Sequence, residues 1–323
     1  MRREKIKKLI LMVLTITLIF GINIKALKAD EDFDKFIKPM TNPVYFDEPF
    51  NRTYVELLTA YQHLPSSINT TLSPSNIPLD GHLQLTALRI NYAINDRLSI
   101  VAAKDGYIDF APKYILTHQS GWGDIAGGLK CALIRDPQNE FVLSAKVLFE
   151  FSQGSRSVFQ GNGSGNAAPS LTFLKGYKNF EFVGMLGGVV PFDRSQSSTE
   201  LMDSWHISYD LIKGLGCSDT KNKIFPLIEL NHFHVLQSGN YTSNEFPEAA
   251  AGIVKFEGGD VINLGAPNAG DHPDFVTLGV GFRYRSNYPC FPLDFGFAYE
   301  FPLTEKENGL MSNRLSWDLI YRF

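Results

Sequence analysis

The chain has 323 residues, 44% of them hydrophobic and 13% aromatic, and its 30 basic and 34 acidic residues give a net charge of −4. An acidic balance gives it no electrostatic reason to bind nucleic acid. Three cysteines are too few for the disulfide framework of a small secreted domain.

Residues 1–29 predict a secretory signal peptide. A basic N-terminus precedes an apolar run over 9–22, and the segment ends in Leu27-Lys28-Ala29. The run is shorter than the roughly 20 residues that a membrane-spanning helix needs. Removing seven basic residues and one acidic residue with this segment leaves 23 against 33, a net charge of −10. No later apolar run is long enough for a membrane helix, so an exported chain that spans a membrane is predicted to be a closed β-barrel.

Residues 30–52 are polar and interrupted by Pro39, Pro43 and Pro49. We expect either a periplasmic lead-in or a small plug that enters the barrel, and the sequence leaves both open. The barrel domain is predicted to follow over 53–323.

Twelve strand-sized runs predict an all-β fold, a transmembrane antiparallel β-barrel. Each is close to the roughly 9–11 residues that cross a bilayer at a tilt, and bacterial barrels have even strand numbers. In most of them apolar residues alternate with polar ones, whereas 81–93 and 224–236 are less regular. The second run shows a change of phase near Asn231 that a β-bulge would absorb. The predicted strands are 53–63, 81–93, 97–108, 122–134, 140–151, 168–178, 179–190, 204–213, 224–236, 274–285, 293–301 and 313–323.

The connections alternate between short turns and long polar segments, 214–223 being the chief exception. Outer-membrane barrels have short periplasmic turns and longer extracellular loops. The longest segment, 237–273, is predicted either to constrict the mouth or to be a variable surface loop. Cys217 and Cys290 fall in neighbouring turns on the periplasmic side, and a disulfide between them is a hypothesis because the periplasm is oxidising.

The last strand ends with an apolar, mostly aromatic face that we expect to meet the lipid of the outer membrane. It resembles the C-terminal signal by which bacterial outer-membrane barrels are recognised, so the barrel-assembly machinery is an expected partner. The residues of this candidate signal are Trp317, Leu319, Tyr321 and Phe323.

The opposite face of the strands places charges of both signs inside the barrel. Either they pair across a packed interior, or they line a hydrated path for small-molecule solutes. Inward Gly279, Gly281 and Gly296 leave space that favours a passage, and a twelve-stranded barrel is intermediate in width. The candidate lumen-lining residues are Lys130, Lys146, Glu150, Arg283, Arg285, Glu300 and Asp318.

Two short motifs carry a family resemblance. The first runs from Asn42 to Pro49 and continues to His63-Leu64-Pro65, and the second is Gly121-Trp122-Gly123-Asp124-Ile125. With the aromatic last strand, they resemble outer-membrane transporters associated with phenol meta-pathway degradation. The resemblance covers most of the chain after residue 29. It implies a barrel that takes up small organic compounds, including aromatic or hydrophobic ones.

We do not expect an enzyme, a metal site or a cofactor. His206 and Ser208 have the spacing of a lipid hydrolase pair, but their parity points them into the lumen, and Tyr209-Asp210 follows where outer-membrane phospholipases have Asn-Gly. His232 and His234 share a strand face, but two ligands do not make a metal site. The prediction is an outer-membrane channel for passive uptake of small solutes. The alternatives are a non-conducting surface, adhesive or structural barrel and, less favoured, a lipid hydrolase.

Overall fold

The computed structural model describes residues 31–72, 76–216, 221–288 and 291–323, which form a closed antiparallel barrel of twelve wall strands. Cys217 and Cys290 lie outside the described residues. Ten wall strands are continuous: β1 (Tyr54–His63), β4 (Gly81–Ala93), β9 (Phe141–Phe151), β10 (Asn166–Tyr177), β11 (Phe180–Pro191), β12 (Thr199–Tyr209), β13 (Asn222–Gln237), β14 (Asp274–Ser286), β15 (Leu293–Pro302) and β16 (Asn313–Arg322).

The remaining two wall strands are each interrupted once. β4 pairs with β5 (Leu98–Lys104) at one end and with β6 (Tyr107–Pro112) at the other. β8 (Ile125–Asp136) pairs with β5, and β7 (Gln119–Trp122) pairs with β6. The predicted strands 97–108 and 122–134 therefore both extend further toward the long loops, with breaks at Asp105-Gly106 and Gly123-Asp124.

Pairing of the first strand with the last closes the barrel. β1 is hydrogen-bonded to β4 on one side and to β16 on the other, with Tyr54 opposite Arg322 and His63 opposite Asn313. The aromatic side chains of β16 point outward and are exposed. Closure satisfies the backbone groups that an edge strand would leave open, which is what a wall inside a membrane requires.

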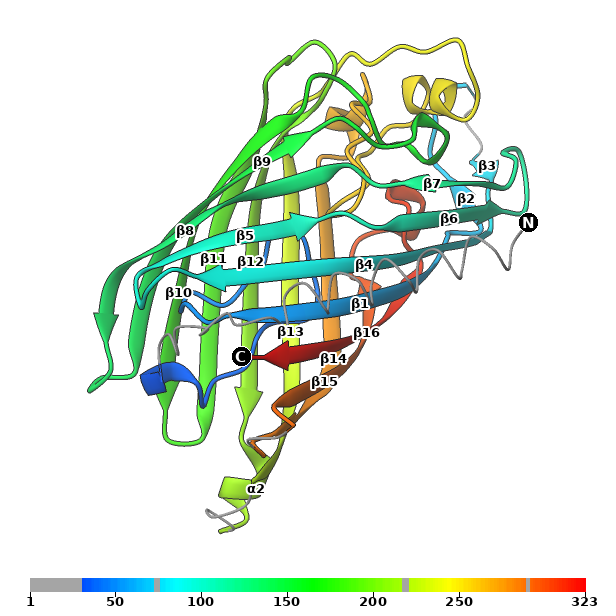
Figure 1. The fold of residues 1–323 in the computed structure, drawn as a ribbon. Helices are drawn as coiled ribbons and strands as arrows, with labels where there is room; N and C mark the ends of the chain where they lie inside the picture. Colours follow the sequence, from blue (N-terminus) through cyan, green and yellow to red (C-terminus); the bar gives the residue numbers. More distant parts are fainter. Residues whose placement is uncertain (1–30, 73–75, 217–220, 289–290) are drawn as a thin grey trace, which may run out of the picture.

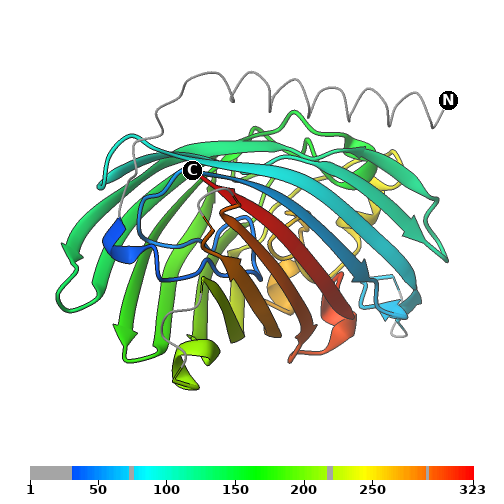
Figure 2. The same ribbon diagram turned by 60° about the horizontal axis from the view of Figure 1, so that its bottom comes forward.

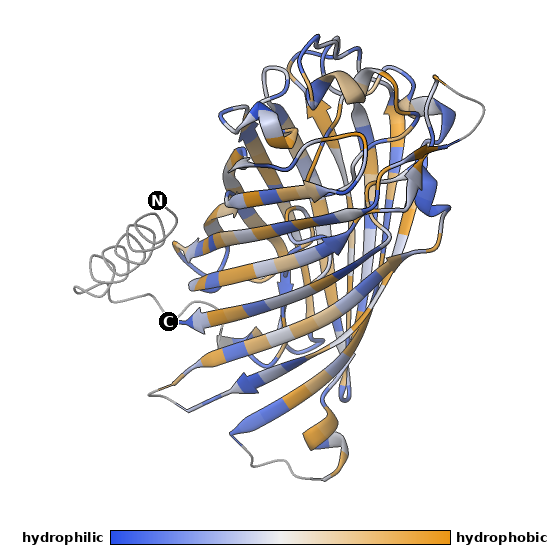
Figure 3. Ribbon diagram, turned by 90° about the vertical axis from the view of Figure 1, so that its right-hand side faces the viewer, coloured by the Kyte–Doolittle hydropathy of each residue, from blue (hydrophilic) through white to orange (hydrophobic). Residues whose placement is uncertain are grey.

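Side chains alternate between a buried inner face and an exposed, largely apolar outer face, and Figure 3 shows orange and blue segments alternating along the strands. The predicted change of phase near Asn231 is wrong. β13 keeps one register with β14 from Asn222 to His234, and Glu229 and Asn231 both point inward. The pattern looked irregular because two histidines take outward positions that are apolar elsewhere on the strand.

Connections of different length separate to the two ends of the barrel (Figure 1). One end carries 94–97, 137–140, 178–179, 210–221 and 287–292. The other, the long-loop end, carries 64–80, 113–118, 152–165, 192–198, 238–273 and 303–312. The predicted strand 204–213 is shifted, because Asp210 caps a short helix, α2 (Leu211–Gly214), after β12 ends.

Besides α2, the described residues outside the wall form only small elements. These are the hairpin of β2 (Ser67–Ile68) and β3 (Ile77–Pro78), and the 3-10 turns η1 (Glu31–Phe33), η2 (Arg156–Val158), η3 (Glu248–Gly252), η4 (Ala269–Asp271) and η5 (Lys306–Asn308). Within the described ranges, no helix combines the length and apolarity needed to cross a membrane.

Candidate functional site

The barrel interior is the candidate site, and a segment from before the first strand fills much of it. Residues 33–53, here called the N-terminal segment, have little regular structure beyond the end of η1, and most of their side chains are buried. Figure 2 shows this blue segment crossing the space that the strands enclose. Because it belongs to no sheet, its backbone groups need partners other than a neighbouring strand.

Acidic side chains of the wall accept hydrogen bonds from the backbone N–H groups of the segment. Glu229 on β13 accepts from Met40 N at 2.9 Å and from Thr41 N at 2.6 Å, and it also accepts from the Thr41 hydroxyl. Glu181 on β11 accepts from Ile37 N at 3.0 Å. Both carboxylates are buried, so these charge-assisted bonds are strong ones.

Basic side chains of the wall donate to the carbonyl groups of the same segment. Lys130 Nζ lies 2.9 Å from the Glu48 carbonyl oxygen, and Lys146 Nζ lies 2.8 Å from that of Tyr45. Arg285 donates to the Phe36 carbonyl at 2.8 Å.

The sequence suggested that the inward charges either pair with one another or line a hydrated path. The structure shows a third arrangement. In addition to pairing with one another, the charges serve as hydrogen-bonding partners for a peptide without secondary structure. Sixteen polar and charged residues that the sequence analysis assigns inward are each buried: Glu56, Gln62, Arg89, Asn91, Asp124, Lys130, Lys146, Glu150, His206, Asp210, Arg283, Arg285, Asp294, Glu300, Asp318 and Arg322.

The other four candidate lumen residues form ion pairs along the wall. Arg283 makes two 2.8 Å bonds to Asp318, and Glu150 pairs with Lys104 at 2.8 Å. Glu300 accepts from Arg314 at 2.6 Å. Arg314 also reaches Asp260 of the longest loop at 2.8 Å, so the wall charges bind both the N-terminal segment and a long loop.

The prediction that inward glycines leave open space is wrong. A Cβ on Gly279 would lie 2.6 Å from Thr41 Cγ2, and a Cβ on Gly296 would lie 2.6 Å from Met40 Cε. At Gly281 it would meet the neighbouring strand, 2.3 Å from the Phe297 carbonyl oxygen. At Gly279 and Gly296, the absent side chain lets the N-terminal segment approach the wall closely.

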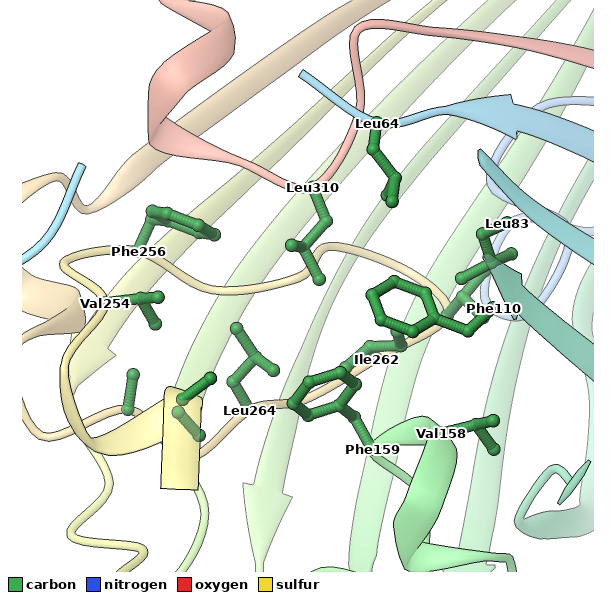
Figure 4. Packing of buried hydrophobic residues seen from close by; sticks show 14 of the residues in the cluster. Leu64, Leu83, Phe110, Val158, Phe159, Val254, Phe256, Ile262, Leu264 and Leu310 are labelled. Carbon is green, nitrogen blue, oxygen red and sulfur yellow. The ribbon is translucent and has the colours of Figure 1, made fainter. Parts of the chain in front are cut away.

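An apolar cluster fills the long-loop end of the bore, and we call it the mouth cluster. Its loop 238–273 contributes Phe256, Ile262 and Leu264, which face residues of β4, β6 and three other loops (Figure 4). Phe110 meets Phe159 edge to face at a centroid distance of 5.5 Å. The facing residues labelled in Figure 4 are Leu64, Leu83, Phe110, Val158, Phe159 and Leu310.

Between the N-terminal segment and the mouth cluster, a small cavity remains. A cavity of about 20 Å³ lies against Val44, Arg89, Lys104 and Val261, which is enough for about one water molecule. Nearer the end of the barrel with the short turns, the Glu48 carboxylate is 3.7 Å from Lys130 Nζ and 3.9 Å from Arg52 Nε. Neither of its oxygens has a hydrogen-bond partner among the described residues. At these distances the opposite charges attract one another without a direct hydrogen bond.

The pair His206 and Ser208 points inward, and each residue contacts a different carboxylate. His206 Nδ1 is 2.6 Å from Glu229 and Ser208 Oγ is 3.1 Å from Glu181. These are the two carboxylates that hold the N-terminal segment, so the pair belongs to the packing of the bore and faces away from lipid.

Sequence reasoning missed Glu181, Glu229, Arg314 and Lys104. Parity alone indicates Glu181, because Phe180 and Phe182 alternate with it. Glu229 was hidden by the apparent change of phase in its strand. The sequence left open whether residues 30–52 enter the barrel, and it did not show which wall residues they contact, because an irregular segment has no periodicity to read.

Comparisons with known proteins rest on structure alone, because no family model matches the chain and no curated protein matches it. The COG4313 outer membrane channel from Pseudomonas putida F1 superposes with a TM-score of 0.56 at 10% identity, covering 89% of this chain and 100% of that one. The chain has the fold of an outer-membrane channel. The NanC porin matches with a TM-score of 0.45 at 9% identity, covering 83% and 98% of the two chains. OprD from Pseudomonas aeruginosa gives 0.35 at 9%, covering 88% and 96%.

Proposed function

We propose that this protein is an outer-membrane channel for passive passage of small solutes, closed in the present structure by its N-terminal segment. The observation that carries the proposal is how that segment is held. It contributes to no strand of the wall, so moving it breaks side-chain contacts but leaves the barrel ladder intact. The wall behind it is charged, and a twelve-stranded bore is wide enough for a narrow path once the segment shifts.

The solutes we propose are small organic compounds, including aromatic or hydrophobic ones. The mouth cluster is mostly apolar, so a solute that passes where the cluster opens meets mainly apolar side chains, which suit an aromatic or hydrophobic compound better than a sugar or an ion. The resemblance to transporters of the phenol meta-pathway points to the same class.

The alternative is a barrel that conducts nothing and is stabilised by its filling. The number of wall charges bonded to the segment favours this reading, because each bond opposes its movement.

A reversible disulfide between the N-terminal segment and the wall distinguishes the channel from the non-conducting barrel. A Cβ built on Gly279 lies 3.6 Å from Thr41 Cβ, which is within the range for a disulfide. We would combine Thr41→Cys with Gly279→Cys in a chain whose three native cysteines are serine. Conductance in planar bilayers and swelling of liposomes in aromatic, sugar and amino-acid solutes would then be measured before and after reduction.

We expect the oxidised double variant to lose conductance and the reduced one to regain it, while each single variant conducts in both states. Equal conductance of the oxidised and reduced double variant would show that the segment does not gate. A parent protein that never conducts, although correctly folded, would favour the non-conducting barrel.

A further inference from the structure

Outside the barrel, at the long-loop end, four polar side chains from three strands meet on an otherwise apolar surface. His232 and His234 come from β13, Asp203 from β12 and Asp274 from β14. In the ladders, His232 is opposite Asp203, and His234 is opposite Asp274. The cluster is half-buried at the two histidines and open at Asp274.

The ligand atoms converge on one point. Asp274 Oδ1 lies 2.9 Å from His232 Nε2 and 2.7 Å from His234 Nδ1. The ligand atoms of His232, His234 and Asp274 all lie within 4.8 Å of one another. Tetrahedral bonds of about 2.0–2.1 Å to zinc separate two ligand atoms by roughly 3.3 Å, so the side chains would have to part by about half an ångström to admit the ion.

The contacts of His232 leave room for a cation at this point. Its Nδ1 is 2.9 Å from Asp203 Oδ2, so in a neutral ring Nδ1 carries the proton and Nε2 presents a lone pair. That lone pair faces Asp274 Oδ1, and two acceptors at 2.9 Å repel each other unless a proton or a metal ion lies between them.

Asp203 lies where a carboxylate can accept the second ring N–H of a metal-binding histidine. Its second oxygen accepts from Trp205 Nε1 at 2.8 Å, which fixes the carboxylate against the His232 ring. Histidines that bind metal commonly donate their other ring N–H to such a carboxylate, which sets the tautomer and the ring orientation.

We propose that His232, His234 and Asp274 bind one zinc-like divalent transition-metal ion, with Asp203 as the positioning residue and water in the fourth place. Two imidazoles with one carboxylate favour zinc over magnesium or calcium, which prefer oxygen ligands. The inference is independent of whether the bore conducts.

The site lies at the base of the longest loop. His234 and Asp274 form the last residue pair of the β13–β14 ladder before residues 238–273, and Val235 N donates to the Pro273 carbonyl beside them. Metal binding would therefore fasten the hairpin whose loop supplies much of the mouth cluster.

The test uses the full chain, without an affinity tag and with its native cysteines replaced by serine, refolded in detergent. Zn²⁺ affinity is measured by competition with a chelating dye, and Co²⁺ is added to record its visible spectrum. We expect one ion per chain, no competition from millimolar Mg²⁺, and slower hydrogen exchange at the Val235 amide in the zinc form.

The variants His234→Ala and Asp274→Asn should each weaken binding at least a hundredfold. Asp203→Asn should weaken it roughly 10- to 100-fold while the stoichiometry stays at one. His118→Ala is the matched control, because His118 also contacts an aspartate, Asp109 at 2.8 Å, on an exposed loop, and should change nothing.

Heat-modifiable migration in gels confirms folding of each variant, and the two ligand variants give independent readings if one of them misfolds. A folded parent that binds no Zn²⁺ would overturn the proposal and leave a protonated His232 in place of the metal. Unchanged binding in His234→Ala and Asp274→Asn, or displacement of Zn²⁺ by Mg²⁺, would overturn it as well.

Discussion

The mouth cluster and the N-terminal segment fill two parts of one bore, and different forces hold them. The mouth cluster consists of apolar side chains whose packing has no required direction. The segment also packs apolar side chains such as Phe36 and Phe46 against the wall, but its position is set in addition by hydrogen bonds between charged wall residues and particular backbone atoms. Truncating an apolar side chain should therefore lower the stability in proportion to the volume lost. Removing one wall charge should instead leave several backbone groups without hydrogen-bond partners.

The largest effect is expected from Glu229→Ala. The substitution strands the N–H groups of Met40 and Thr41 and the ring of His206, all of which contact Glu229. Removing one partner from a buried charged network costs about 3–5 kcal/mol. We expect the segment to leave the bore and chymotrypsin to cleave after Phe46, which is fully buried in the parent.

Glu229→Gln is the matched control, since it keeps the size and one acceptor oxygen. Cleavage at Phe46 should be slower in this variant than in Glu229→Ala. Equal resistance of parent and Glu229→Ala would show that the segment is held by packing, and the contrast between the two regions would be lost.

Phe256→Ala should have the next largest effect, confined to the mouth cluster. Phe256 is 1% exposed, and truncating a buried Phe costs about 3 kcal/mol or more, with the low end expected where loops can collapse. Hydrogen exchange should speed up across 238–273 and stay unchanged over 37–41. Phe246→Ala, at a position that is 70% exposed, should alter neither region.

The smallest effect is a pH dependence at the edge of the mouth cluster. Burial raises the pKa of Glu257 from 4.5 to about 7, although its carboxylate accepts from Leu264 N at 2.6 Å and Ala266 N at 3.0 Å. Glu200 of β12 is the neighbouring acid that repels it. Because the pKa is higher in the folded loop than in an unfolded one, the stabilising contribution is complete below about pH 4.5 and is lost as pH rises through about 7.

Over that interval the loop should lose at most about 3–4 kcal/mol, since each pKa unit corresponds to 1.36 kcal/mol. Hydrogen exchange of residues 254–266, corrected for the intrinsic rate at pH 5 and pH 8, measures the change. Glu257→Gln should be nearly independent of pH, and an equal pH dependence in that variant would assign the effect to another group.

Alternation of side chains carried most of the fold prediction. A strand has a period of two, so each residue of β9, β14, β15 and β16 could be assigned to one face from its position alone. The strand count followed from these runs, and the separation of short and long connections followed from their spacing. The breaks at Asp105-Gly106 and Gly123-Asp124 were missed because the residues on either side were read as one continuous strand, although the inward parity switches there. The inward residues are Val101 and Ala103 before the first break and Ile108 and Phe110 after it.

By itself, the sequence determined the wall. It indicated which residues face outward, which face the bore, and that one end carries short turns and the other long loops. Only the tertiary structure decided what fills the bore, because contacts between Glu229 and Thr41, or between Gly296 and Met40, join residues more than 180 positions apart. No local pattern records such contacts. It also brought Asp203 and Asp274 beside His232, since a ligand set spread over three strands exists only once their register is fixed.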